Sequence, residues 1–129
     1  MRETVTHINR YGWKLTVYSH FTCEYTFSVI RHLAEMGCGE DLLKAAMENM
    51  DACDYNTGLA YSKAGIRESV VVIYRTSSFG QLVDTLSHEM VHVCGHISKV
   101  EGIDPHSEEF CELCGYLMRM NSVILTDYL

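Results

Sequence analysis

The sequence predicts an α+β fold in which a small sheet packs on helices, with all 129 residues in a single domain. Three observations favour this class. Several short segments have the alternating or continuous apolar pattern of β-strands, and longer ones carry apolar residues at helical spacing. Hydrophobic residues make up 47% of the chain, which is enough for one core. No internal repeat or linker divides the chain.

The N-terminal half is expected to contain a strand followed by two helices. Residues 13–21 alternate in hydrophobicity and include β-branched and aromatic side chains, which predicts a strand. A helix is expected over residues 24–36, because apolar side chains recur there at helical spacing, at Phe27, Ile30, Leu33 and Ala34. Residues 40–50 predict a second helix, because their apolar side chains recur at the same spacing.

The middle of the chain predicts a hairpin and then a long helix. Residues 59–62 and 69–74 are two β runs separated by a short Lys-Ala-Gly turn. The second run is almost continuously apolar, so we expect an inner strand that is covered on both faces. Ser78 and Gln81 match a capping box, and the helix that begins there is expected to run to about Ile97.

A last helix is expected from His106 or Ser107 to about Asn121. Apolar residues within it recur at helical spacing, which predicts that one side packs on the rest of the domain. The residues that share this side are Phe110, Leu113, Leu117 and Asn121.

Charge and composition exclude two classes of partner. The formal net charge is −7 and no cluster of lysine and arginine exceeds two residues, so the sequence has little of the basic footprint that binding to nucleic-acid phosphates requires. No apolar run is long enough to span a membrane, and the first residues contain no apolar leader segment. We therefore expect a cytoplasmic protein with no nucleic-acid and no membrane partner.

The six cysteines are expected to be reduced and mostly buried, as is usual in the cytoplasm. Cys111 and Cys114 form a Cys-x-x-Cys pair, but one such pair cannot complete a four-cysteine zinc site. Their helical surroundings are also unlike a redox turn, so we expect both to be small core residues.

The most specific chemical signal is His88-Glu89-Met-Val-His92, within the long helix. Histidines four residues apart lie one turn above each other, so both imidazoles can bind one Zn²⁺ ion. On a helical wheel both fall opposite Phe79, the first residue of the apolar stripe, and so outside the core face. The motif predicts a zinc site at which Glu89 removes a proton from an activated water.

A third ligand is expected from the last helix. Glu108 has small residues three and seven positions later, which would allow another helix to approach closely. Glu112 lies one turn after Glu108 and could hold the free ring N–H of a ligand histidine. Glu109 and His106 stay open as alternative third ligands.

Together, His88-Glu-x-x-His92 and Glu108-x-x-Cys-Glu112 resemble the pattern of gluzincins, a class of zinc metallopeptidases. The resemblance implies Zn²⁺ as cofactor, Glu108 as third ligand and Glu112 as the partner of a ligand histidine. Most of the chain is also similar, segment by segment, to small uncharacterised HExxH proteins of bacterial and phage genomes, which implies a zincin-like fold. His106 lies where SprT-like peptidases have their third histidine.

The resemblance implies zinc-dependent hydrolysis of a peptide or protein substrate, with Glu89 as general base. It also implies that the motif helix lies beside strand 69–74 and that a sheet edge holds the substrate by strand addition. Tyr61, Tyr116 and His96 are candidates for stabilising the oxyanion. Two alternatives stay open: a non-catalytic, zinc-stabilised binding or accessory protein, and a hydrolase that acts on something other than peptides.

Overall fold

The structure is a computed structural model that describes residues 1–128. Its four strands are β1 (Arg2–Ile8), β2 (Trp13–Phe21), β3 (Gly58–Lys63) and β4 (Glu68–Tyr74). Its helices are α1 (Thr26–Glu35), α2 (Glu40–Asp51), α3 (Phe79–Glu101), α4 (Glu108–Met120) and α5 (Val123–Thr126), with short 3-10 turns η1 (Asn9–Tyr11), η2 (Cys23–Tyr25) and η3 (Ala64–Ile66). The α+β class predicted from the sequence is confirmed.

The sheet is mixed, with the strand order β1-β2-β4-β3. β2 and β4 are parallel, whereas β1 and β3 are antiparallel to their neighbours and form the two edges. The predicted hairpin of β3 and β4 is confirmed, and every residue from Ser69 to Tyr74 is buried, as expected for an inner strand. This order leaves β3 with one side free for another strand.

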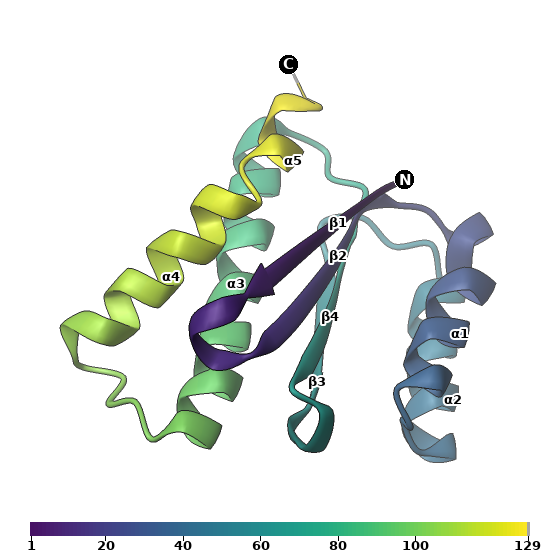
Figure 1. Cartoon of the computed structure of the whole chain (residues 1–129). Helices are drawn as coiled ribbons and strands as arrows, with labels where there is room; N and C mark the ends of the chain where they lie inside the picture. Colours follow the sequence, from purple (N-terminus) through teal and green to yellow (C-terminus); the bar gives the residue numbers. More distant parts are fainter. Residues whose placement is uncertain (129) are drawn as a thin grey trace.

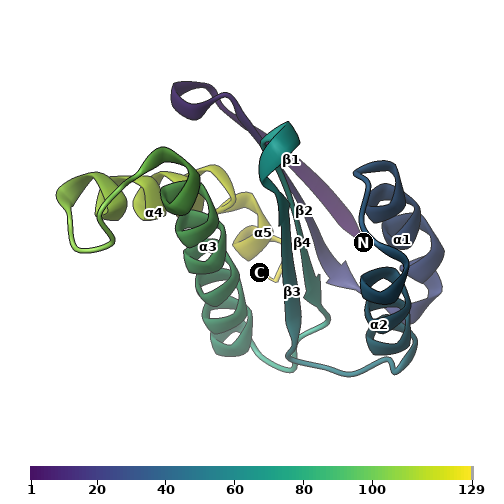
Figure 2. The same ribbon diagram turned by 90° about the horizontal axis from the view of Figure 1, so that it is seen from below.

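Helices cover both faces of the sheet, so the domain has three layers (Figures 1 and 2). α1 and α2 lie on one face, and α3, α4 and α5 lie on the other. Successive side chains of β4 alternate between the two cores: Val71 and Ile73 belong to the core under α3, and Val70 and Val72 belong to the core under α1 and α2. The nearly continuous apolar run of β4 therefore serves both layers.

Local expectations for the helices are partly confirmed. The Ser78 side chain accepts a hydrogen bond from the Gln81 N–H, and the Ser107 side chain caps α4 in the same way. α3 runs beyond Ile97 to Glu101, because the helix ends only where Gly102 adopts a left-handed conformation with φ of 70°. The expectation for Phe27 is wrong, since 76% of this residue is exposed.

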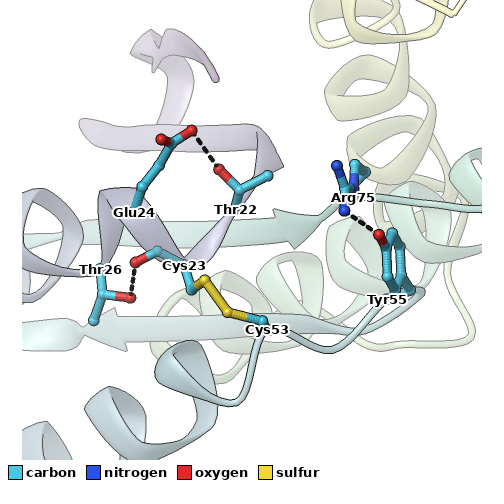
Figure 3. Close-up of a disulfide and its surroundings, with 7 residues drawn as sticks. All are labelled: Thr22, Cys23, Glu24, Thr26, Cys53, Tyr55 and Arg75. Carbon is cyan, nitrogen blue, oxygen red and sulfur yellow. Dashed lines mark hydrogen bonds between the residues drawn. A yellow bond between two sulfur atoms is a disulfide. The ribbon is translucent and has the colours of Figure 1, made fainter.

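The expectation that all cysteines are reduced is wrong for one pair. Cys23 and Cys53 form a disulfide with a Cα–Cα distance of 5.1 Å (Figure 3). The physical reason is the α1–α2 hairpin, which returns the chain so that the end of α2 lies beside the start of α1. Cys111 is exposed, so the expectation of a core position is wrong for it as well, whereas Cys114 packs against the core.

The segment that follows the disulfide leads directly into β3. Tyr55 accepts a hydrogen bond from Arg75, and the Arg75 guanidinium lies 4.5 Å from the centroid of the Tyr55 ring (Figure 3). Thr26 donates a hydrogen bond of 2.8 Å to the Cys23 carbonyl on the other side of the disulfide. The contact with Arg75 therefore holds the connection between α2 and the edge strand, and the Thr26 hydrogen bond holds the turn that carries Cys23.

None of the helices described is both long and apolar enough to cross a membrane.

Candidate metal centre

α3 carries the two histidines on the side that faces away from the core. Its buried residues, among them Leu86, Met90 and Val93, pack on the sheet, which leaves His88 and His92 exposed. The side chain of His88 is 65% exposed. The helical wheel therefore predicted correctly that the histidines lie outside the apolar stripe.

The two imidazoles are placed to share one ion. Their Nε2 atoms lie 3.1 Å apart. Two imidazoles bound to one tetrahedral zinc at about 2.0–2.1 Å each would have their nitrogens about 3.3 Å apart. The His88 and His92 pair therefore fits two of the positions around a zinc ion with only a small adjustment.

Glu89 points to the other side of the helix surface, against the edge strand. It is 5% exposed, and a Cβ at Gly58 of β3 would lie 2.9 Å from both its Cγ and its Oε1. The absence of a side chain at Gly58 is thus what makes room for this carboxylate. Glu89 Oε1 lies 3.9 Å from His88 Nε2, so the carboxylate borders the histidine pair.

The electrostatics of Glu89 suit proton transfer. Burial raises the pKa of the Glu89 carboxyl, and charge on His88 and His92 opposes this only in part. Its Oε2 atom is buried and has no hydrogen-bond partner within residues 1–128. A buried carboxylate with an unused oxygen and a raised pKa is suited to take up a proton.

His96 is anchored to the edge strand. Its Nδ1 lies 2.6 Å from the Ser62 hydroxyl of β3, which in turn lies 2.6 Å from the Ser69 hydroxyl. Trp13 donates a hydrogen bond of 2.8 Å to Ser69, so the chain of contacts ends in the core. Burial lowers the pKa of His96, and charge on His92 and Lys99 adds to the effect, which favours the uncharged ring.

Of the three candidates for the oxyanion contact, His96 lies nearest the histidine pair, with its ring centroid 6.4 Å from that of His92. Tyr61 packs with the α1–α2 layer, on the opposite face of the sheet. Tyr116 lines a groove of about 490 Å³ between α4 and η1. An oxyanion role for His96 stays a prediction.

The third-ligand candidates lie elsewhere. α4 runs antiparallel to α3, and at its C-terminal end Asn121 Nδ2 lies 3.8 Å from Met90 Sδ. Glu108 begins α4 and is separated from the contact between Asn121 and Met90 by the 13 residues of the helix, a distance of about 20 Å along the helix axis. His106 precedes α4 and so lies at the same distant end.

The other two carboxylates of α4 have different neighbours. Glu109 pairs with Arg10 at 3.5 Å, and Glu112 lines the groove beside η1. Within the part of the chain that the structure describes, no three His, Cys, Asp or Glu side chains form a group that could hold a metal. The set of His88, His92 and Glu108 predicted from the sequence is therefore not assembled here.

The histidine pair instead faces an open surface. A shallow pocket of about 340 Å³ lies over it, lined by Asp84, Ser87, His88, Val91 and His92. Val91 is 52% exposed, in contrast to the fully buried apolar residues on the opposite side of α3.

Comparisons with protein-family models, with curated proteins and with solved structures found no match to this chain. Gly58 and Ser62, which place Glu89 and His96, had no local sequence signal, because their role depends on β3 lying against α3.

Proposed function

We propose that the protein is a zinc-dependent hydrolase of peptide bonds, with His88 and His92 as metal ligands and Glu89 as general base. The observation that carries this proposal is the pairing of two imidazoles 3.1 Å apart with a buried carboxylate beside them. An antiparallel edge strand next to the motif helix also supports a zincin-like fold. The resemblance to gluzincins supplies the reaction class.

Glu89 has the central role among the protein groups. A zinc ion at the histidine pair would supply Lewis-acid polarisation of the scissile carbonyl and would lower the pKa of a water nearby. Glu89, whose Oε1 lies 3.9 Å from His88 Nε2, would accept the proton of the attacking water and later donate it to the leaving amine. Burial raises the pKa of this carboxyl, which is consistent with the role of a general base that holds a proton.

β3 is the element that we propose for substrate binding. It is an edge strand, so its outer backbone groups are free to pair with an extended peptide. The same strand covers Glu89 at Gly58 and contacts His96 at Ser62. A peptide that added to this edge would pass over both side chains.

The test combines metal analysis with an assay on unstructured protein substrates. Glu89→Gln keeps both imidazoles, so we expect it to retain zinc and to lose turnover, whereas His92→Ala should lose the zinc. Glu48→Gln on α2 is a matched control, because Glu48 is exposed on the opposite layer. Full activity of Glu89→Gln, or equal zinc content in His92→Ala and the wild type, would contradict the proposal.

A further inference from the structure

The histidine pair is an incomplete zinc site. Zinc in proteins is four-coordinate, and structural sites use four protein donors. His88 and His92 supply two; Asp84 lines the same pocket and Glu89 Oε1 lies 3.9 Å from His88 Nε2, but no three His, Cys, Asp or Glu side chains of residues 1–128 form a group that could hold a metal. The missing donors must come from water, from a substrate or from another chain.

The surface around the pair is exposed. We define the dihistidine face as Ser87, His88, Val91, His92 and Gly95 of α3. Val91 at its centre is 52% exposed, and a Cβ at Gly95 would meet no described atom within 4 Å. Small residues on either side of an exposed valine let a second helix approach α3 closely.

We propose that a second copy of this chain completes the site, so that the His88 and His92 pairs of two copies bind one zinc ion. A two-fold axis through the ion doubles the two donors to four and needs no other residue. Such an axis perpendicular to α3 sets the two helices antiparallel. In this arrangement Asp84 of one copy, near one end of the dihistidine face, lies towards Lys99 of the second copy, near the other end. The two side chains have opposite charges, so this pairing is electrostatically favourable.

This inference rests on the proposed metal binding by His88 and His92, and it assigns a regulation to the same site. Four imidazoles leave no position for water, so the zinc-bridged dimer is the resting form. The monomer, whose ion keeps open positions, is the form that can hydrolyse a substrate. Dimerisation also covers the pocket over the pair.

The first test measures zinc content and molecular mass together. Metal-free full-length chain is titrated with Zn²⁺, its bound zinc is measured by atomic emission, and its mass is measured by sedimentation. We expect one zinc ion per two chains at the mass of a dimer, reversed by EDTA. One zinc ion per chain at the mass of a monomer would overturn the dimer and leave the hydrolase proposal intact, whereas no zinc binding would overturn both.

The second test uses two valines of the same helix. Val91→Lys places like charges across the two-fold axis, and we expect it to raise the dissociation constant of the zinc-bridged dimer by about tenfold or more. Val100→Lys is the matched control, because Val100 is 39% exposed and lies nine residues later, about 180° away around α3. Equal dimerisation of the two variants would overturn the assigned face.

A third measurement separates the inference from the proposed function. Specific hydrolytic activity should fall as the zinc-bridged dimer forms, and Val91→Lys should resist this fall. A zinc-bridged dimer whose monomer has no hydrolytic activity at any dilution would contradict the regulatory assignment and the hydrolase together. In that case the four-histidine site itself would stand.

Discussion

A methyl group at position 58 tests whether the edge strand holds the Glu89 carboxylate in place. The added Cβ of Gly58→Ala would lie 2.9 Å from Cγ and Oε1 of Glu89 and 3.1 Å from Cδ, well inside van der Waals contact. Overpacking of this kind costs about 1–3 kcal/mol. We therefore expect Gly58→Ala to lower the free energy of unfolding by that amount, measured by urea denaturation of the metal-free protein.

The cause is isolated by a double-mutant cycle. In a Glu89→Ala background the carboxylate is absent, so adding Gly58→Ala should cost less than about 0.5 kcal/mol. The coupling energy between the two substitutions should then equal the free-energy cost of the clash in the wild-type background. Gly65→Ala in η3 is the control, because a Cβ there meets no described atom within 4 Å. An equal cost of Gly58→Ala in both backgrounds would refute the close packing of β3 on Glu89.

Three further predictions follow from the structure. Replacing Cys23 and Cys53 by alanine removes the disulfide, which joins residues 30 positions apart, and should lower the free energy of unfolding in urea by about 3.5 kcal/mol. A reductant should abolish this difference between the wild type and the variant. Burial raises the pKa of Glu89 above its usual 4.5, so the folded state holds the proton more tightly than the unfolded state does. The wild type should therefore lose stability relative to Glu89→Gln as the pH rises from 4.5 through the raised pKa. Parallel curves of stability against pH for the two proteins, measured in EDTA, would contradict this. Glu108→Ala should bind as much zinc as the wild type, because Glu108 lies at the far end of α4, whereas His92→Ala should not; loss of zinc from Glu108→Ala would instead restore the ligand set predicted from the sequence.

Several elements were predictable because local rules determine them. The Trp13–Phe21 strand follows from alternation, and the start of α3 follows from the Ser78 cap, which needs only residues three positions apart. β1 was missed, because its buried positions include Thr6, so it has no apolar alternation to detect. The disulfide was also missed, because the proximity of Cys23 and Cys53 results from the return of α2 along α1.

The same division holds at the candidate site. The sequence alone determined that His88 and His92 lie one turn apart and outside the apolar stripe, because both facts follow from the period of an α-helix. Only the tertiary structure decided that Glu89 is buried under Gly58, that Ser62 holds His96, and that Glu108 is far from the histidine pair. These depend on the order of strands in the sheet and on the antiparallel packing of α4 on α3. Both are contacts between segments distant in sequence, which the spacing of residues along the chain does not encode.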